Sequence, residues 1–204
     1  MTARRLVGVA GVAALVVSLV TACSGQSSSG GATKGPSTAA SKAQIRAAHL
    51  ESCPSSSSEV VSGGLPNLTL PCLGQGPDVH LAGLTGKPTV VNVWGSWCTE
   101  CQKEEPYLTT AYDALRHKVR FLGVDSVDEA DSAINYGMRG VNPPIRFPSV
   151  FDPDHKVLNG LHFDGTPLTV FVDATGRIVG KNYVAYRSTA AVERDVSKYL
   201  HVST

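Results

Sequence analysis

Two cysteines lie three positions apart in the segment Trp97-Cys98-Thr99-Glu100-Cys101, directly after the apolar run Thr89–Trp94. Such a pair can close into a disulfide. If a strand ends and a helix begins here, the Cys98 sulfur lies at the helix N-terminus, where unpaired N–H groups and the helix dipole favour a thiolate. Because the thiolate attacks other disulfides, the segment predicts thiol–disulfide exchange, with Cys98 as nucleophile and Cys101 as the cysteine that resolves the mixed disulfide.

The surrounding pattern predicts alternating strands and helices. Thr89–Trp94 is a nearly continuous run of apolar and β-branched residues, which is typical of a central parallel strand. Val119–Val124 is the next strand and completes a β-α-β unit with a right-handed crossover. The helix between them starts at Cys98 and would bury a stripe with helical spacing, formed by Leu108, Ala111, Tyr112 and Leu115.

The second half of the chain continues this alternation. Ser126-Val127-Asp128-Glu129 has the pattern of a capping box, which would open a helix that ends near Gly140. The turn sequence Asp173-Ala174-Thr175-Gly176 predicts a hairpin, and a last helix follows Ser188 or Thr189. The further strands expected are Pro148–Phe151, Leu168–Val172 and Ile178–Val184. The predicted fold is therefore α/β, with a mixed sheet between helices.

The first 22 residues have the pattern of a bacterial lipoprotein signal peptide. Arg4 and Arg5 form a basic n-region, and the apolar run Leu6–Val20 is shorter than the about 20 residues of a transmembrane helix. Small residues then precede Cys23, which would be diacylated after cleavage. The alternative is an ordinary signal peptide or an uncleaved anchor. With either one, the rest of the chain would lie outside the cytoplasm, and the lipoprotein reading places it on the outer face of the cell membrane.

Composition divides the remainder into two parts. The segment from Ser24 to about Ala43 is almost wholly Ser, Gly, Thr, Ala and Lys, so we expect a flexible tether over residues 23–51. Residues 52–204 are numerous enough for one domain with its own core. The formal net charge is +1 and there is no basic run, which gives no support for nucleic-acid binding.

The sequence has five cysteines, and lipidation of Cys23 would leave four. With Cys98 and Cys101 as the local pair, Cys53 and Cys72 remain for a second disulfide, which we expect to be structural; a second redox pair is the alternative. A structural zinc site usually shows two close cysteine pairs, and here only one close pair exists. The six histidines are scattered, so we expect neither a metal nor another cofactor.

Three motifs in this order resemble the thioredoxin fold, and more narrowly the membrane-anchored TlpA/ResA-like reductases. The motifs are Val91-Asn-Val-Trp-Gly-Ser-Trp-Cys98, Cys101-Gln-Lys-Glu104-Glu-Pro106 and Gly165-Thr-Pro167-Leu-Thr-Val-Phe-Val-Asp173. The similarity covers the chain from about Leu65 to the C-terminus. The segment Val127–Phe151 is similar to the central insertion of that subfamily.

The resemblance implies roles for several residues. Glu104, one turn after Cys101, would manage the proton of that cysteine, because Asn92 replaces the buried strand aspartate of thioredoxin and cannot titrate. The alternative is that Glu104 is a solvated helix residue. The peptide bond between Thr166 and Pro167 would be cis and would hold the Thr166 backbone beside the disulfide, where it can pair with substrate.

Three neighbouring residues complete these expectations. Pro106 lacks the N–H group that would bond Gln102, so a helix kink is expected there. Trp97 would cover the active site, although a role as a rim aromatic is the alternative. Glu105 is expected to be a solvated helix residue.

Glu100 departs from the family, in which proline is frequent at this position. A carboxylate beside the thiols disfavours a second negative charge and should raise the pKa of the thiols. A thiolate that is less stable weakens the reduced form, which would favour action as a reductant.

The sequence therefore predicts a membrane-tethered thiol–disulfide oxidoreductase that reduces disulfides in exported proteins. The resemblance implies apocytochrome c as a possible substrate and a membrane electron donor of the CcdA/DsbD type. The alternatives are an oxidant that installs disulfides and a thioredoxin-fold module that binds partners without turnover. A peroxidase has less support, since no peroxidatic cysteine with a nearby threonine pattern appears upstream of Trp97.

Overall fold

The computed structural model describes residues 42–139 and 143–204. The predicted signal peptide, Cys23 and most of the predicted tether lie outside these residues, as does Gly140, where a helix was expected to end. Within the described part of the chain, every helix is too short or too polar to cross a membrane.

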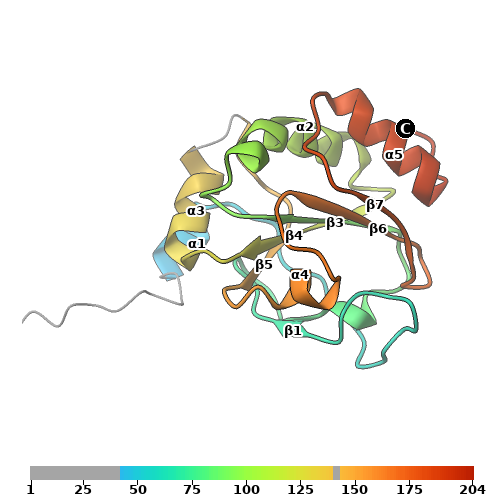
Figure 1. Cartoon of the computed structure of the whole chain (residues 1–204). Helices are drawn as coiled ribbons and strands as arrows, with labels where there is room; N and C mark the ends of the chain where they lie inside the picture. Colours follow the sequence, from blue (N-terminus) through green and yellow to red (C-terminus); the bar gives the residue numbers. More distant parts are fainter. Residues whose placement is uncertain (1–41, 140–142) are drawn as a thin grey trace, which may run out of the picture. The chain divides into compact units, whose positions relative to one another are not determined.

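A five-stranded sheet in the order β5-β4-β3-β6-β7 forms the centre of the domain (Figure 1). Neighbouring strands β3, β4 and β5 run parallel, whereas β6 is antiparallel to both β3 and β7. The mixed sheet and the α/β class predicted from the sequence are therefore confirmed. The strands are β3 (Thr89–Trp94), β4 (Arg120–Ser126), β5 (Ser149–Asp152), β6 (Leu168–Val172) and β7 (Ile178–Asn182).

Helices and a small second sheet cover the two faces of this sheet. On one face lie α2 (Thr99–Leu115), α3 (Ala130–Arg139) and α5 (Thr189–Leu200), and α1 (Lys42–Ala47) packs against α3. The other face is covered by a short helix α4, a 3-10 turn and a two-stranded antiparallel sheet. Their bounds are β1 (Thr69–Leu70), β2 (Val79–His80), η1 (Leu81–Gly83) and α4 (Lys156–Gly160).

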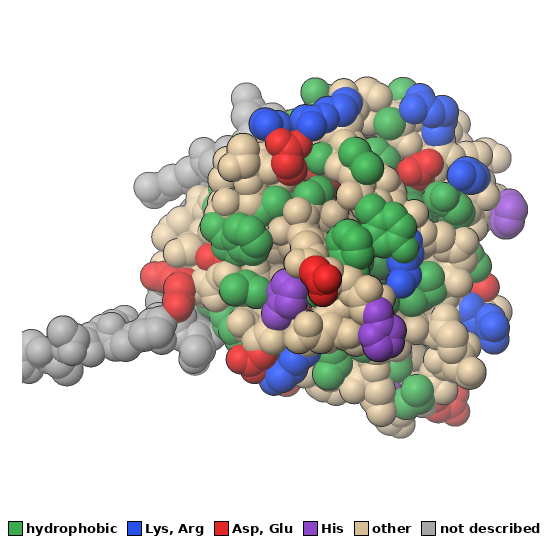
Figure 2. Space-filling model, in the orientation of Figure 1, with side chains coloured by type: hydrophobic (Ala, Val, Ile, Leu, Met, Phe, Trp, Pro, Cys, Tyr) green, Lys and Arg blue, Asp and Glu red, His purple; other side chains and the backbone are tan. Residues whose placement is uncertain are grey.

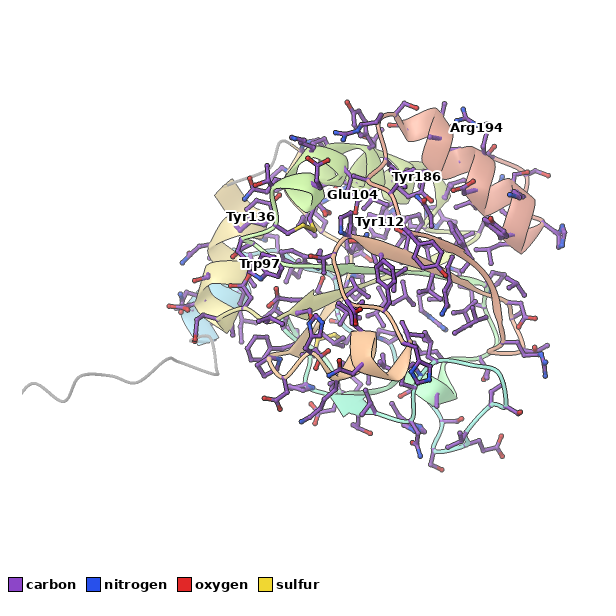
Figure 3. The ribbon with its side chains drawn as sticks, in the orientation of Figure 1. Trp97, Glu104, Tyr112, Tyr136, Tyr186 and Arg194 are labelled. Carbon is purple, nitrogen blue, oxygen red and sulfur yellow. A yellow bond between two sulfur atoms is a disulfide. The ribbon has the colours of Figure 1, made fainter. Side chains whose placement is uncertain are left out.

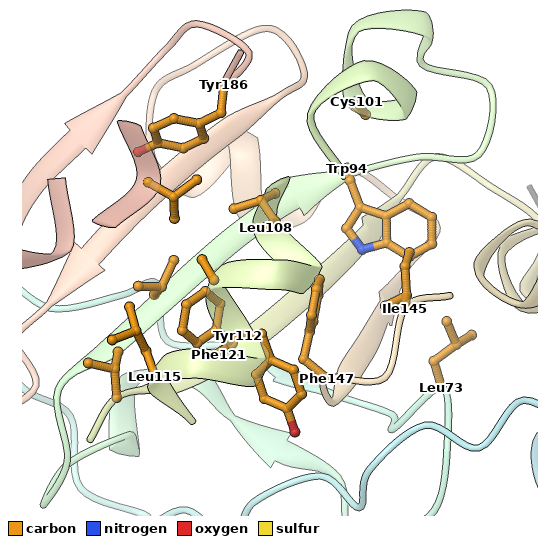
Figure 4. Close-up of a cluster of buried hydrophobic side chains, with 14 of the residues drawn as sticks. Leu73, Trp94, Cys101, Leu108, Tyr112, Leu115, Phe121, Ile145, Phe147 and Tyr186 are labelled. Atoms are coloured by element: carbon orange, nitrogen blue, oxygen red, sulfur yellow. The ribbon is translucent and has the colours of Figure 1, made fainter. Parts of the chain in front are cut away.

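Each face of the sheet has its own hydrophobic core. Under α2 the predicted stripe is buried, and Tyr112 packs edge-to-face against Phe121 and Phe147 at ring distances of 5.6 and 5.7 Å (Figure 4). The second core lies under α4 and the β1–β2 sheet and is built mainly from Val and Leu. Every residue of β3 is buried, because the strand is central and covered on both faces. The end of β3, where the chain turns toward Cys98, is therefore fixed by packing on both faces of the sheet.

Two expectations about boundaries are wrong. Ser126 does not cap α3, because it is the last residue of β4 and its hydroxyl lies 3.3 Å from Nδ1 of His155. The carboxylate of Asp128 instead accepts the N–H group of Glu129, at 2.8 Å. The folded part also begins before residue 52. Ala48 is buried in the core and the N–H group of Glu51 bonds the carbonyl oxygen of Arg146, at 2.7 Å.

A disulfide joins Cys53 and Cys72, with 6.0 Å between the Cα atoms. Cys72 forms an isolated antiparallel bridge with Val150 of β5, and the N–H group of Cys53 bonds the carbonyl oxygen of Gln75, at 2.8 Å. The disulfide therefore attaches the irregular segment before β1 to β5, at the edge of the main sheet.

Candidate active site

The other cysteine pair closes a disulfide at the junction of β3 and α2. The Cα atoms of Cys98 and Cys101 are 5.2 Å apart. Cys98 is the N-cap residue of α2, and its sulfur accepts a hydrogen bond from the N–H group of Cys101, at 3.1 Å. In the reduced state this N–H group and the helix dipole would stabilise a Cys98 thiolate. Cys98 is 5% exposed and Cys101 is 1% exposed, so an incoming disulfide meets Cys98 first.

The last residue of β4, Ser126, and the nearby Asp128 hold the loop before Cys98. The N–H group of Ser96 donates to Oδ2 of Asp128 at 2.6 Å, and Nε1 of Trp97 donates to the carbonyl oxygen of Ser126 at 3.2 Å. Position 95 needs glycine, because a Cβ atom there would lie 2.5 Å from Nε1 of Trp97. Trp97 is 54% exposed next to the cysteine pair (Figure 3). Its indole is thus held in place while its face stays open to a partner.

Thr166 and Pro167 reach the same end of the sheet from a distant part of the chain. Strands β3 and β6 are antiparallel, and Val93 lies opposite Leu168. Thr166 and Pro167 come immediately before β6, so they lie near the end of β3 that leads into Cys98. Their peptide bond is cis. The fold therefore brings the two predicted motifs to one edge of the sheet.

Glu104 is wholly buried on α2, one turn after Cys101 (Figure 3). Its Oε1 accepts a hydrogen bond from Nδ2 of Asn92 at 2.8 Å, and its Oε2 accepts one from the N–H group of Tyr186 at 3.0 Å. Burial raises the pKa of Glu104 to about 7, and the two hydrogen bonds limit the rise. A carboxyl group with this pKa can take up and release a proton at neutral pH.

Glu105 is not solvated, contrary to expectation. It is 0% exposed, and neither carboxylate oxygen has a hydrogen-bond partner. Burial and the neighbouring charge of Glu104 raise the pKa of Glu105 well above its usual range. The buried hydroxyl of Tyr136, on α3, interacts electrostatically with Glu105 and also lacks a partner. Helix α3 therefore covers the side of α2 that the sequence pattern left open to solvent.

Asp125 is another buried acid near the site. It lies opposite Trp94 in the β3–β4 register and is 0% exposed. Burial, followed by the charges of Asp128 and Asp152, raises the pKa of Asp125 to about 9. Both of its carboxylate oxygens lack a hydrogen-bond partner. Asp125 is therefore neutral at pH 7.

Glu100 is paired with two cations, which changes its expected effect on the cysteines. Its carboxylate pairs with Nζ of Lys103 at 2.5 Å and with Nη2 of Arg187 at 2.6 Å. The hydrogen bonds with Lys103 and Arg187 lower the pKa of Glu100. The two cations offset its negative charge, so its effect on the thiols is weaker than the sequence suggested.

Sequence reasoning missed three residues that shape this site: Asp128, Tyr186 and Arg187. The sequence pattern indicates only a capping role for Asp128. In the structure, its Oδ2 atom also accepts the hydrogen bond from Ser96 that holds the loop. Tyr186 contributes a backbone N–H group, which carries no sequence signal. Arg187 is 87 positions from Glu100, and only the tertiary structure brings the two together.

The geometry of the site suits exchange between a dithiol and a disulfide. Cys98 is the N-cap residue of α2 and the more exposed of the two cysteines, and Cys101 lies one turn deeper. The carboxyl group of Glu104, with a pKa of about 7, can hold the proton of Cys101. Trp97 lies next to the pair (Figure 3), and Thr166 lies at the same end of the sheet.

Comparison with known proteins identifies the family. The model of the AhpC/TSA family matches residues 61–181, which is more than half of the chain. The chain is 30% identical over 104 residues to thiol-disulfide oxidoreductase ResA of Bacillus subtilis (strain 168), covering 51% of this chain and 57% of ResA. It is 33% identical over 113 residues to thiol:disulfide interchange protein DsbE of Xylella fastidiosa (strain 9a5c), covering 54% of this chain and 55% of DsbE. The chain thus spans a little over half the length of these relatives.

Solved structures agree with the fold. The structure of MTB DsbF in mixed oxidised and reduced forms matches with a TM-score of 0.56 and 26% identity, covering 66% of this chain and 98% of DsbF. A secreted Mycobacterium tuberculosis disulfide oxidoreductase homologous to E. coli DsbE matches with a TM-score of 0.53 and 25% identity, over 65% of this chain and 96% of that protein. The chain belongs to the AhpC/TSA family and has the thioredoxin fold.

Proposed function

We propose that the protein is a thiol–disulfide oxidoreductase that reduces disulfides in exported proteins. The observation that carries the proposal is the Cys98–Cys101 disulfide at the N-terminus of α2, with the buried carboxyl of Glu104 one turn away. The names of the relatives, thiol-disulfide oxidoreductase ResA and thiol:disulfide interchange protein DsbE, support the same reaction class.

The proposed reaction has two exchange steps. In the reduced protein, the Cys98 thiolate attacks one sulfur of the substrate disulfide, and the other substrate sulfur leaves and takes a proton. Glu104 then accepts the proton of Cys101, whose sulfur attacks Cys98. The Cys98–Cys101 disulfide forms and the second substrate sulfur leaves as a thiol. Two electrons pass from the protein dithiol to the substrate.

The proposed direction depends on Glu104 more than on Glu100. Above pH about 7 the ionised carboxylate of Glu104 is a buried negative charge one turn from Cys101, which disfavours a thiolate there. A reduced form that is not stabilised gives up its electrons more readily. The charge of Glu100 is offset by Lys103 and Arg187, so it contributes less.

The surface around the cysteine pair supports a protein substrate. Trp97, Val127, Tyr183 and Val184 are large apolar side chains that are between 46% and 68% exposed. Figure 2 shows hydrophobic side chains gathered near the middle of one face and basic side chains along the edge over α2 and α5. An extended apolar segment of a partly folded protein would bury such side chains favourably.

The proposed location is the outer face of the cell membrane, with a lipid on Cys23. The sequence pattern of residues 1–23 supports it. After each turnover a membrane donor of the CcdA/DsbD type would reduce the Cys98–Cys101 disulfide, and apocytochrome c is the substrate that the family resemblance implies.

A trapping experiment tests the function. The Cys101→Ser variant lacks the resolving sulfur, so it should accumulate mixed disulfides between Cys98 and its substrates, detectable by mass spectrometry under non-reducing conditions. The reduced wild-type protein should also catalyse insulin reduction. Insulin reduction that fails while reduced model dithiols are oxidised would identify an oxidant instead. Full function in cells of a Cys98→Ala/Cys101→Ala variant would identify a binding module.

A further inference from the structure

At the end of β3 opposite the disulfide, basic side chains line a cavity of about 220 Å³. Lys87 comes just before β3 and Cys98 follows it, so the six residues of the strand, roughly 20 Å, separate the cavity from the cysteine pair. A ligand in the cavity would not touch the sulfurs. We call this cavity the basic pocket, and its polar lining consists of Glu51, Lys87, Tyr112, Arg116, His117 and Arg120.

The lining of the basic pocket is positively charged. Lys87, Arg116 and Arg120 contribute three positive charges and Glu51 contributes one negative charge, which leaves a net charge of +2 without counting histidine. Oε1 of Glu51 accepts a hydrogen bond from Nη1 of Arg116 at 2.9 Å, so the one carboxylate is already paired. Lys87 and Arg120 account for the excess charge.

Lys87 and Arg120 form no salt bridge within residues 42–139 and 143–204. Nζ of Lys87 donates to the carbonyl oxygen of Arg116 at 2.7 Å, and Nη1 of Arg120 donates to Oγ1 of Thr89 at 3.1 Å. These acceptors are neutral. Both cations are half-buried, and burial together with the charge of Arg120 lowers the pKa of Lys87. Two adjacent half-buried cations repel each other, and a bound anion would relieve that repulsion.

Tyr112 adds a neutral donor to the basic pocket. Its ring packs against Phe121 and Phe147, and its hydroxyl points out of that cluster (Figure 4). The hydroxyl is buried on the side of the ring that faces Glu51 and Arg116. Burial, followed by the nearby carboxylate of Glu51, raises the pKa of Tyr112, so the hydroxyl stays protonated and can donate.

We propose that the basic pocket binds a phosphate-type oxyanion, either as a free anion or as the headgroup of an anionic phospholipid. Guanidinium and ammonium groups are the donors that such oxyanions take in proteins. The volume is below the about 300 Å³ at which pockets for drug-sized ligands begin, so the pocket suits a single oxyanion group.

The test measures binding of inorganic phosphate and of vesicles to the full chain carrying Cys23→Ala, which removes the lipid attachment site. Calorimetric titration with phosphate at constant ionic strength should give saturable binding. The Lys87→Gln/Arg120→Gln variant should bind at least tenfold more weakly. Arg194→Gln is the control for loss of positive charge elsewhere and matches the single variant Lys87→Gln. It removes one positive charge from an exposed residue of α5 outside the pocket, and it should bind like the wild type.

Vesicles distinguish the two sources of the anion. The wild type should sediment with phosphatidylglycerol vesicles more than with phosphatidylcholine vesicles. If binding to the phosphatidylglycerol vesicles is at least tenfold weaker in the double variant than in the wild type, the ligand is a headgroup. If only phosphate binding falls, the ligand is a soluble anion. If neither phosphate nor phosphatidylglycerol distinguishes the double variant from the wild type, the proposal is wrong. Lys87→Gln alone, which removes only the hydrogen bond to the carbonyl oxygen of Arg116, provides the same comparison should Arg120→Gln unfold the domain.

Discussion

The backbone N–H group of Tyr186 donates a hydrogen bond to Oε2 of Glu104 at 3.0 Å, across 82 positions of sequence. The loop after β7 thereby meets α2 one turn from the cysteine pair. The next residue of that loop, Arg187, pairs with Glu100 between the two cysteines. A single loop therefore contacts both the buried acid and the exposed acid of the candidate site.

Glu104→Gln should slow disulfide exchange by on the order of 100-fold at pH 8, because general acid–base groups contribute at least this much. In the wild type the rate should rise as Glu104 ionises through pH about 7 and becomes able to accept the proton of Cys101. The variant should lose this rise. Stopped-flow measurement of the reaction with a model disulfide from pH 5 to 9 checks it. Glu105→Gln, which replaces the adjacent buried carboxyl group, should keep the rise.

Asn92→Leu should move the midpoint of the same pH profile upward. The hydrogen bond from Nδ2 of Asn92 lowers the pKa of Glu104, and hydrogen bonds to charged groups contribute enough to shift a pKa by roughly one unit. Nδ2 of Asn92 also donates to Oγ1 of Thr169, so Thr169→Val is the control and should leave the midpoint in place. An unchanged midpoint in Asn92→Leu would show that Glu104 does not set the profile.

Arg187→Gln should make the cysteine pair more reducing with little loss of stability. The exposed ion pair with Glu100 contributes little to folding. Without Arg187, the charge of Glu100 is less offset and the Cys98 thiolate is less favoured. Equilibration with glutathione redox buffers measures the potential. A potential that moves in the oxidising direction would contradict this electrostatic account.

Asp125→Asn should stabilise the protein more at pH 8 than at pH 5. The pKa of Asp125 is about 9 in the folded state and 3.8 ordinarily, so between these values the folded state binds the extra proton. Stability therefore falls as pH rises through this range, by at most roughly 1.4 kcal/mol per pH unit. The variant should lack that contribution. Urea denaturation at pH 5, 6.5 and 8 gives the free energy of unfolding of the wild type and of the variant as a function of pH. If the two proteins change in parallel with pH, the prediction is wrong.

Removal of the Cys53–Cys72 disulfide by double substitution with serine should lower the free energy of unfolding by about 3 kcal/mol, because the bridge closes a loop between positions 19 apart. Insulin reduction at a temperature where the variant is folded should stay at the wild-type rate. Loss of turnover in a stable variant would instead make this a second redox pair. Denaturant unfolding and the turnover assay together separate the two roles.

The sequence by itself predicted the elements that carry the site. The apolar β-branched run Thr89–Trp94 and the helical stripe under α2 are local patterns, because side-chain periodicity follows directly from strand and helix geometry. The spacing of Cys98 and Cys101 placed the pair at the strand-to-helix junction. The boundary errors at Ser126 and residue 52 arose because a short polar segment gives the same local signal whether it caps a helix, ends a strand or packs on a core.

Only the tertiary structure decided the electrostatics. Glu104, Glu105 and Glu100 lie within six positions on one helix, yet the first is buried with two hydrogen bonds, the second is buried with none, and the third is exposed between two cations. The ionisation of a carboxyl group depends on its solvation and on charges brought close by distant segments, here β3, α3 and the loop after β7. Sequence spacing determines which residues share a helix, whereas folding determines which of them face water.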